Sequence, residues 1–409
     1  MLPLRLVDSK VASGDRITAA RRNPVRPKEN FLIFGAPKFE EEEIAEVVAC
    51  MRSGWVGTGP RTARFEKAFS DYCGGGSAVA VNSCTAALHL SILAAGLRSG
   101  DEVVTTPLTF CATVNAIIHA GCVPVLADVD PMTMNVDPAA AARRITPRTK
   151  AILPVHYAGR PCDMDTLVAL AQENNLRLIE DCAHAIETEY KGRKAGTFGD
   201  FGCFSFYVTK NVVTGEGGMI LAKHEGDAAR LKRLALHGMS KDAWHRFGDA
   251  GYKHYGVLDA GFKYNMMDLQ ASIGLHQLAR VEKNWQRRRD IWQHYDQAFG
   301  GLPITLPAAP EPQTRHAHHL YTILVDDQRC GISRDQFLEG MTAHHIGVGV
   351  HYLSIPEHPF YQQAFDMRAQ DYPVAMRIGR QTVSLPLSPG LSDGDVDDVI
   401  AAVTQLLNG

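Results

Sequence analysis

The 409-residue sequence has almost no excess charge and no long apolar run. Its 42 Lys and Arg residues oppose 45 Asp and Glu residues, which gives a formal net charge of −3 at pH 7. General nucleic-acid binders usually carry a basic excess, so we expect no nucleic-acid partner. No uninterrupted apolar segment approaches the roughly 20 residues that cross a bilayer, so we expect no membrane partner. The apolar content of 45% excludes a disordered chain.

Motifs of disulfide frameworks and metal centres are also missing. The nine cysteines are an odd number, and no two of them have C-x-x-C spacing. Residues 1–30 contain no apolar signal segment, which favours a cytoplasmic protein with free thiols. The 17 histidines suggest metal ligands, but the H-E-x-x-H pattern is absent. We therefore predict no metal site.

Composition and apolar periodicity divide the chain into three parts. Residues 1–30 are basic and predict an extension that is either mobile or packed on a partner. Residues 31–280 alternate short β-rich runs with helix-length segments, which predicts a large cofactor-binding domain. Residues 281–409 mix strand and helix patterns, which predicts a smaller C-terminal α/β domain.

The β-rich runs of the large domain are apolar without alternation, a pattern typical of strands buried on both faces. Strands are predicted over residues 78–81, 102–106, 123–127, 151–155, 176–179, 203–206 and 218–222. The helix-length segments between them predict an α/β fold, with a mostly parallel sheet of the seven-stranded type flanked by helices. The last two runs have no helix between them, which predicts a local departure from the parallel arrangement.

Two of the predicted helices matter for the later argument. Residues 40–52 place Ile44, Val47, Val48 and Met51 on one helical face. The glycine-rich loop G-W-V-G-T-G-P ends this helix. Residues 268–299 carry apolar residues at helical spacing and predict one long helical stretch.

Ligands of open α/β sheets bind beyond the carboxyl ends of the strands. N-S-C-T over residues 82–85 opens a helix whose free N–H groups could bind an anion, although a plain helix cap explains the same residues. Phe110 follows the next strand and either stacks on a flat ring or belongs to the core. Asp181 follows a further strand and either pairs with a cation or caps a helix. Lys210 follows residues 203–206 and is either a Schiff-base former or a solvated lysine.

Taken together, these four features match one cofactor. Pyridoxal 5′-phosphate has a phosphate, a flat ring, a basic pyridine nitrogen and an aldehyde, and the strand ends offer a partner for each. An acid that keeps the pyridine nitrogen protonated makes the ring an electron sink. A lysine amine can form an imine with the aldehyde and carry protons. We therefore predict pyridoxal 5′-phosphate as the cofactor.

The order of the sequence motifs carries a family resemblance. The chain contains, in this order, N-S-C-T-A-A-L, T-F-x-A-T, P-V-H-Y-A-G, E-D-C-A-H-A, G-D-F-G-C-F-S-F-Y-V-T-K-N, T-G-E-G-G and Y-N-M-M-D-L-Q-A. Over residues 31–409 it thereby resembles the sugar aminotransferases of the DegT/DnrJ/EryC1/StrS family. These enzymes have fold type I, the fold of aspartate aminotransferase. The block over residues 199–218 is the most specific part of the resemblance.

This resemblance assigns roles to the catalytic candidates. It implies that Lys210 forms the aldimine with the cofactor and moves protons. It also implies that Asp181 pairs with the pyridinium nitrogen and that His184 lies near the 3-hydroxyl group of the ring. The implied reaction is a ping-pong transamination from an amino acid, L-glutamate, to a keto sugar.

The resemblance also assigns residues that bind the cofactor. Phe110 would stack on the ring, while Cys84, Thr85 and Ser205 would hold the phosphate. Asn265 matches the family asparagine that reaches the phosphate of the neighbouring subunit. The resemblance therefore implies an obligate homodimer with a shared active site.

The nature of the acceptor substrate is a separate question. The motifs around residues 154–165 and residues 349–352 are similar to those of the branch that acts on C4-keto nucleotide sugars. Candidate substrate contacts are Trp55, Thr58, His319 and His351, although each could also be an ordinary structural residue.

Several alternatives remain beside this reading. A keto-cyclitol or another natural-product ketone is an alternative acceptor, because the cofactor motifs do not exclude it. The dehydratase branch of the family replaces the lysine with histidine, so Lys210 argues against that branch. A non-catalytic regulator is less consistent with the intact motifs, and a Rossmann dinucleotide binder lacks its G-x-G-x-x-G signature.

Overall fold

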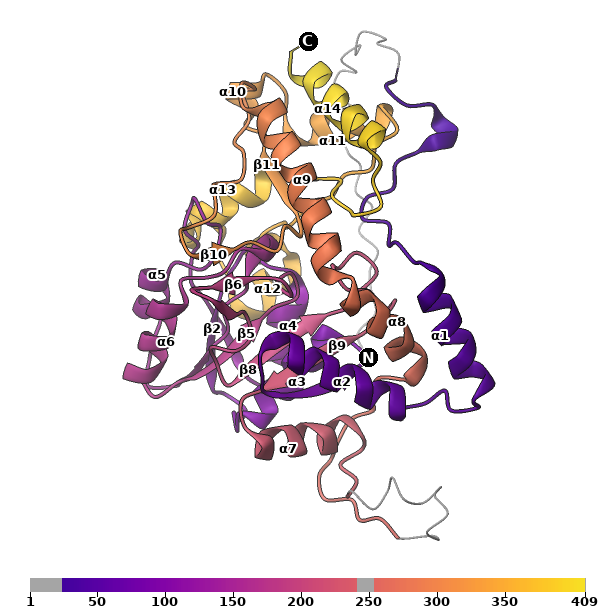
Figure 1. The fold of residues 1–409 in the computed structure, drawn as a ribbon. Coiled ribbons are helices and arrows are strands. Elements are labelled where there is room, and N and C mark those ends of the chain that lie inside the picture. Colours follow the sequence, from indigo (N-terminus) through magenta and orange to yellow (C-terminus); the bar gives the residue numbers. More distant parts are fainter. Residues whose placement is uncertain (1–23, 241–253, 409) are drawn as a thin grey trace, which may run out of the picture.

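The computed structural model describes residues 24–240 and 254–408. Its fold is a layered α/β structure with a central sheet and a smaller region at one end (Figure 1). The helices are α1 Glu41–Arg52, α2 Pro60–Cys73, α3 Cys84–Ala94, α4 Cys111–His119, α5 Pro138–Arg143, α6 Met164–Glu173, α7 Glu225–Ala235, α8 Asp268–Ala279, α9 Val281–Phe299, α10 Asp327–Cys330, α11 Arg334–Ala343, α12 Pro359–Phe365, α13 Pro373–Gln381 and α14 Asp393–Leu407. Among these helices, none is long and apolar enough to cross a lipid bilayer.

The central sheet has seven strands in the order β1-β9-β8-β5-β4-β2-β3. Their bounds are β1 Ser77–Val81, β2 Glu102–Thr105, β3 Val123–Leu126, β4 Thr149–Ile152, β5 Arg177–Asp181, β8 Phe201–Ser205 and β9 Gly218–Ala222. Strand β9 runs antiparallel to both of its neighbours, while the remaining pairs are parallel. The predicted fold class is therefore confirmed, and β9 is the predicted departure from the parallel arrangement.

Helices cover both faces of this sheet, because successive strand residues point to opposite sides and both sides are apolar. Cys203 faces the core formed with α3, α4 and α7. Its neighbour Phe204 faces the opposite core, formed with α2 and α8. Helices α5 and α6 extend this second layer over Val104 and Ile152. The strand ends are therefore held between two packed layers.

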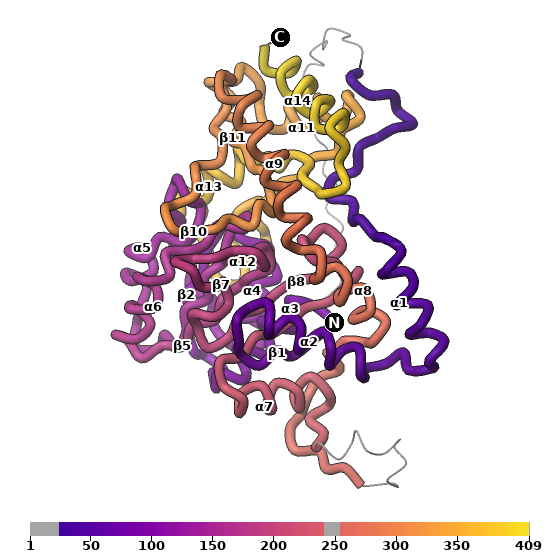
Figure 2. The backbone as a smooth tube through the Cα atoms, in the orientation of Figure 1, coloured from indigo at the N-terminus to yellow at the C-terminus, as the bar shows by residue number. Residues whose placement is uncertain are grey.

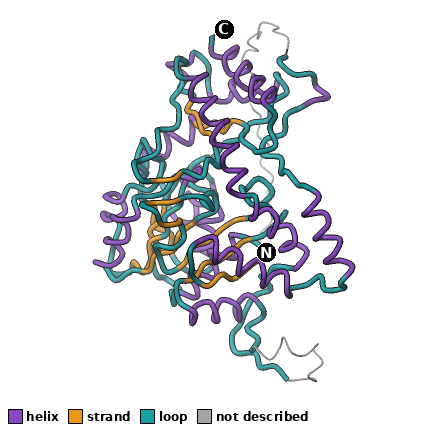
Figure 3. Tube along the Cα trace, in the orientation of Figure 1, coloured by secondary structure: helices purple, strands orange, loops and turns teal. Residues whose placement is uncertain are grey.

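A smaller region lies beyond the central sheet. Strands β11 Tyr321–Leu324 and β12 Thr382–Leu385 form a two-stranded antiparallel sheet that shares a core with α9, α11 and α14. Figure 3 shows this pair near one end of the molecule, apart from the large group of strands. A three-stranded sheet, β10-β6-β7, consists of β6 Glu189–Tyr190, β7 Arg193–Lys194 and β10 Thr314–Arg315.

The described end of the predicted N-terminal extension contacts this smaller region. The Arg26 guanidinium lies 2.7 Å from carboxylate oxygens of Asp395 and of Asp398 on α14. Figure 2 shows the backbone of the first described residues running beside the smaller region. Residues 24–30 therefore lie against the last helix of their own chain. The rest of the extension, residues 1–23, lies outside the described residues.

Two helical predictions differ from the structure. The stretch over residues 268–299 is two helices, because Arg280 has φ −101° and ψ 1° and separates α8 from α9. The predicted domain boundary falls at this residue, and it stays a prediction. In α1, the side that packs on α8 buries Glu43 and Cys50, whereas the apolar residues Ile44, Val48 and Met51 are exposed.

Candidate active site

The predicted cofactor residues gather at the carboxyl ends of the parallel strands. Asp181 is the last residue of β5, and Ser205 is the last residue of β8. Cys84 begins α3 directly after β1, and Phe110 precedes α4 after β2. Because parallel strands end on one edge of the sheet, these segments converge there.

Asp181 is a buried carboxylate that its own chain holds in place. The Thr113 hydroxyl donates to Oδ2 at 2.8 Å, and the Ala183 N–H donates to Oδ1 at 3.1 Å. Burial raises the pKa of Asp181, while these hydrogen bonds and the Lys210 cation oppose that rise. A buried carboxylate of this kind favours a cationic partner, which a protonated pyridine nitrogen would supply. Thr113 is a contact that the sequence analysis missed, although it lies inside the T-F-x-A-T motif.

Lys210 has an amine suited to react with an aldehyde. Burial lowers the pKa of Lys210 to about 8, and the nearby Cys84 and Asp181 side chains oppose this shift. The backbone N–H of Lys210 donates to the backbone carbonyl of Tyr207 at 2.8 Å, which fixes the turn that carries the Lys210 side chain. A lysine with a pKa near 8 is neutral often enough at physiological pH to act as a nucleophile.

The start of α3 has the features of an anion cradle. Ser83 caps the helix, and its hydroxyl accepts the Ala86 N–H at 3.1 Å. The first N–H groups of the helix have no intrahelical partner and favour negative charge. Gly218 pairs with Ser205 of β8, and a Cβ on this glycine would lie 2.5 Å from the carbonyl carbon of Ser83. Ser205 therefore lies beside the helix start that the sequence assigns to the phosphate.

An aromatic and a histidine enclose the same edge. The Phe110 side chain is 57% exposed, which leaves a ring face open to a ligand. Its ring centroid lies 5.8 Å from that of Tyr352. The Tyr352 hydroxyl lies 2.9 Å from Nε2 of His184, and the Ala158 N–H donates to Nδ1 of His184 at 3.2 Å. Both ring nitrogens of His184 are therefore engaged within the chain.

His184, His319 and His351 lie close enough to the Lys210 amine to interact with its charge. Burial lowers the pKa of all three rings, to about 4 for His351, and the positive charge of Lys210 acts in the same direction. The rings of His184 and His319 are 4.3 Å apart, and Nδ1 of His351 lies 2.8 Å from the Ser384 hydroxyl. Because these histidines are neutral near pH 7, they contribute hydrogen bonds and not charge.

A network of buried polar side chains holds His319 in place. Its Nδ1 lies 2.9 Å from the side-chain Oδ1 of Asn211, and the side-chain amide of Asn211 donates to the Glu187 carboxylate at 2.7 Å. Glu187 in turn forms an ion pair with Arg288 of α9. These four residues link the smaller region to the site. The sequence does not reveal the link, because the residues lie far apart along the polypeptide.

Asn265, Trp55 and Thr58 form a separate group. The Asn265 amide donates to the Thr58 hydroxyl at 2.6 Å, and the Trp55 indole N–H donates to the Thr58 carbonyl at 3.1 Å. All three line one surface pocket, and Lys210 and Asp181 are not among its lining residues. The structure of the single chain therefore does not place these three candidates with Lys210.

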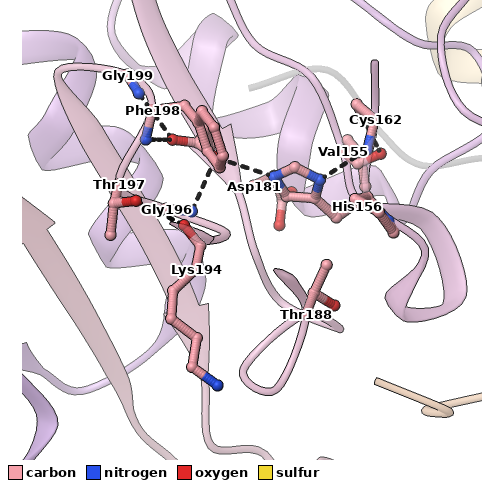
Figure 4. Close-up of polar contacts among 12 residues, drawn as sticks. Val155, His156, Cys162, Asp181, Thr188, Lys194, Gly196, Thr197, Phe198 and Gly199 are labelled. Atoms are coloured by element: carbon pink, nitrogen blue, oxygen red, sulfur yellow. Dashed lines mark hydrogen bonds and ion pairs between the residues drawn. The ribbon is translucent and has the colours of Figure 1, made fainter. Parts of the chain in front are cut away.

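One buried cluster has side chains typical of metal ligands. His156, Glu180 and Cys182 place one ligand atom each within 4.8 Å of one another. Glu180 accepts hydrogen bonds of 2.8 Å from three N–H groups of loop 196–199, and it also lies 3.1 Å from Nε2 of His156. The Cys162 N–H donates to Nδ1 of His156, so the contacts in Figure 4 occupy both ring nitrogens. We interpret this cluster as a structural element that holds loop 196–199 in place. The absence of a metal site stays a prediction.

The fold and the strand-end residues together define a class of enzyme. A half-buried lysine near a buried carboxylate, an open aromatic face and a helix start fit the amine, acid, ring and phosphate partners of pyridoxal 5′-phosphate. The chain belongs to the DegT/DnrJ/EryC1/StrS aminotransferase family, whose model matches residues 37–404. It is a pyridoxal phosphate-dependent sugar aminotransferase, which confirms the predictions of family, enzyme class and cofactor.

Individual relatives agree with this assignment. The chain is 46% identical over 386 residues to the spore coat polysaccharide biosynthesis protein SpsC of Bacillus subtilis, which covers 94% of this chain and 99% of SpsC. It is 32% identical to the putative sugar aminotransferase Spr1654 of Streptococcus pneumoniae in its PLP form, with a TM-score of 0.86 over 92% of this chain and 99% of that one. It is 29% identical to DesI, solved in the presence of its TDP-sugar product, with a TM-score of 0.81 over 93% and 94% of the two chains.

Proposed function

We propose that this enzyme transfers the amino group of L-glutamate to the keto carbon of a nucleotide-linked 4-keto sugar. The observation that carries the proposal is that the Lys210 amine and the buried Asp181 carboxylate lie close enough to interact electrostatically with each other and with Cys84 at the start of α3. DesI, a structural neighbour, was solved with a TDP-sugar product, which supports a nucleotide sugar as the substrate class. The donor and the acceptor position remain proposals that rest on the family resemblance.

Each of the site residues has a distinct part in this proposal. Pyridoxal phosphate, when bound, supplies an electron sink for the transfer of the amino group. The Asp181 carboxylate would keep a proton on the pyridine nitrogen, and the N–H groups at the start of α3 would bind the phosphate. The Lys210 amine would hold the cofactor at its aldehyde group, and Nζ is the atom of this chain that would take up and return the proton during the transfer. Phe110 supports the ring from one face.

The acceptor side of the site is polar without being charged. His319 is buried and His351 is half-buried; both rings are neutral, and each has one ring nitrogen held within the chain. Neutral imidazoles can bind hydroxyl groups as donors or acceptors. We propose that these two histidines contact the hydroxyl groups of the sugar.

We further propose a homodimer in which Asn265 completes the site of the neighbouring subunit. Two observations support it: the apolar residues of α1 are exposed, and the group with Asn265 lies in a pocket away from Lys210. Exposed apolar patches of this kind commonly mark protein interfaces. Trp55 and Thr58 would then contact the substrate from the partner side.

The reaction is tested in two half-reactions. The purified yellow protein should lose its visible absorption band when L-glutamate is added, with release of 2-oxoglutarate. The resulting amino form should then be offered a nucleotide 4-keto sugar, the same sugar without its nucleotide, and a keto-cyclitol. We expect recovery of the band with the nucleotide sugar. Recovery with the keto-cyclitol alone would replace the proposed acceptor, while no response to L-glutamate would reject the proposed donor.

Sharing of the site is tested by mixing two inactive variants, Lys210→Ala and Asn265→Ala. If Asn265 acts in the partner subunit, each mixed dimer has one complete site. Random exchange should then restore about a quarter of the wild-type activity. If Asn265 acts within its own subunit, mixing restores none.

A further inference from the structure

The hydroxyl group of Tyr352 lies within the site, next to His184. We propose that this hydroxyl donates a hydrogen bond to an oxygen atom of the bound ligand, and that His184 is the residue that positions it. The inference rests on the proposed function, since it assigns a role within the same site. The acceptor oxygen belongs to the cofactor or to the keto sugar, and the experiment below distinguishes these two sources.

The first step concerns the proton of His184. The Ala158 N–H donates to Nδ1 of the ring at 3.2 Å, so this nitrogen carries a lone pair and no proton. The ring is neutral at neutral pH, because burial and the Lys210 cation lower the pKa of His184. The single ring proton is therefore on Nε2.

The second step concerns the direction of the Tyr352 hydroxyl. Nε2 of His184 carries the proton, so it donates to the Tyr352 oxygen over their 2.9 Å separation. A phenol has one proton, and this proton cannot point at a nitrogen that is already donating. Within residues 24–240 and 254–408, the Tyr352 hydroxyl has no other hydrogen-bond partner. Its proton is therefore available to a ligand.

The position of Tyr352 directs this donor into the site. The Tyr352 ring lies 5.8 Å from Phe110 and stacks on His184 with centroids 6.0 Å apart. Burial raises the pKa of Tyr352, and the nearby Asp181 and Cys84 side chains raise it further. The hydroxyl thus stays protonated close to the residues predicted to hold the ring and the phosphate.

One turn fixes both members of the pair. Residues 157–159 form η2, in which Ala158 has a φ of +56° and directs its N–H at His184. The Tyr157 hydroxyl of the same turn donates to the carbonyl of His351, the residue before Tyr352. The Thr382 hydroxyl donates to the same carbonyl at 3.2 Å, which ties the segment to β12. The donor is therefore rigidly placed before any ligand binds.

The test compares Tyr352→Phe with wild type and with the control Tyr295→Phe. The Tyr295→Phe variant also lacks one tyrosine hydroxyl. In the wild type this hydroxyl donates to the Pro386 carbonyl at 2.9 Å, in the core of the smaller region. Three quantities are measured: the Kd for pyridoxal phosphate of the apoprotein, the pH titration of the absorption band without substrate, and the KM for the keto sugar. We expect roughly a tenfold change in at least one of them, which is the effect of losing one hydrogen bond.

Each outcome has a definite reading. A change in Kd or in the absorption titration assigns the acceptor oxygen to the cofactor. A raised KM with an unchanged absorption titration assigns it to the sugar. If Tyr352→Phe matches wild type and Tyr295→Phe in all three measurements, the proposal is wrong. A wild-type protein that binds pyridoxal phosphate but does not transaminate would reject the proposed function and leave the cofactor measurements interpretable.

The positioning role of His184 is tested with His184→Gln and His184→Leu. Glutamine can accept from the Ala158 N–H and donate to Tyr352, whereas leucine can do neither. We expect His184→Leu to reproduce the changes of Tyr352→Phe, and His184→Gln to restore part of what His184→Leu loses. In the Tyr352→Phe background the two His184 variants should behave alike. A further loss specific to His184→Leu in that background would show that His184 acts independently and would overturn its positioning role.

Discussion

The Lys210 site and the Asn265 pocket differ in how completely one chain builds them. At the first, Asp181 receives two hydrogen bonds from its own chain, and His184, His319 and His351 have hydrogen-bond partners within the chain. At the second, Trp55 is 47% exposed and Met267 is 43% exposed, and the Asn265 amide donates to the Thr58 hydroxyl. The first region is preorganised in a single chain, whereas the second presents apolar surface to its surroundings.

This difference indicates what each region requires. A preorganised polar site needs only its ligand, because its groups are already oriented. An exposed apolar surface is stabilised when another surface covers it. We therefore expect changes at the Lys210 site to affect chemistry within each subunit, and changes at the Asn265 side to act through assembly.

The largest effect is expected for Lys210→Ala. The variant should show no detectable transamination and no covalent attachment of pyridoxal phosphate, because the amine that lies near Asp181 in the described site is lost. Absorbance and the amount of 2-oxoglutarate measure both losses. The exposed Lys223→Ala is the matched control and should behave as wild type. Wild-type turnover by Lys210→Ala would remove the basis of the proposed mechanism.

Asp181→Asn should have the next largest effect. The amide keeps the shape of the side chain but cannot hold a proton on the pyridine nitrogen. We expect kcat to fall roughly 100- to 1,000-fold, as for the loss of one preorganised electrostatic group. Single-turnover absorbance with L-glutamate measures the fall, and the melting temperature reports any loss of folding. A decrease of less than about threefold would contradict the assigned role of Asp181.

Met51→Asp tests the exposed side of the comparison. A charge within a covered apolar surface is unfavourable, so we expect dimerisation to weaken about 10- to 100-fold. Sedimentation measures the dimer, and activity should fall with dilution as the dimer dissociates. A dimer of unchanged stability would place the interface elsewhere. The same substitution should leave the far-UV circular dichroism unchanged, because Met51 is exposed on the single chain.

The smallest effect is a pH dependence that follows from the Lys210 pKa of about 8. The neutral amine captures the aldehyde, and its fraction grows as pH rises through that pKa. The rate of pyridoxal phosphate capture by the apoprotein should therefore rise roughly five- to tenfold from pH 7 to 9. Asp181→Asn should move the midpoint to lower pH, because Asp181 favours the charged amine. Stopped-flow absorbance measures both, and a flat profile would contradict the lowered pKa.

Much of the fold could be predicted because strand burial is written in local sequence. The apolar runs located all seven strands of the central sheet, and the missing helix between residues 206 and 218 located the antiparallel strand. The break at Arg280 could not be predicted, since its neighbours on both sides have helical periodicity. The face of α1 also could not be assigned, because the pattern does not say whether an apolar stripe packs within the chain or on a partner.

The candidate site was predictable where one motif supplies one strand end. Lys210 and Asp181 follow strands, so position and chemistry appear together in the sequence. The relay from Arg288 through Glu187 and Asn211 joins segments that are distant in sequence, and only their three-dimensional contacts reveal it. Tyr352 belongs to the motif over residues 349–352. Its role depends on the hydrogen bonds of His184 and not on its neighbours in the sequence.

Strand β5 ends in two consecutive acids with different duties. Glu180 holds loop 196–199 on one face of the sheet, and Asp181 faces Thr113 on the other. A slip of β5 by one residue would exchange them, because side chains alternate between faces. The misplaced carboxylates would then be buried without partners, at a large cost in free energy. The two acids therefore disfavour any register of β5 other than the native one. A residue needed for the chemistry thus also helps the sheet to fold in its correct register.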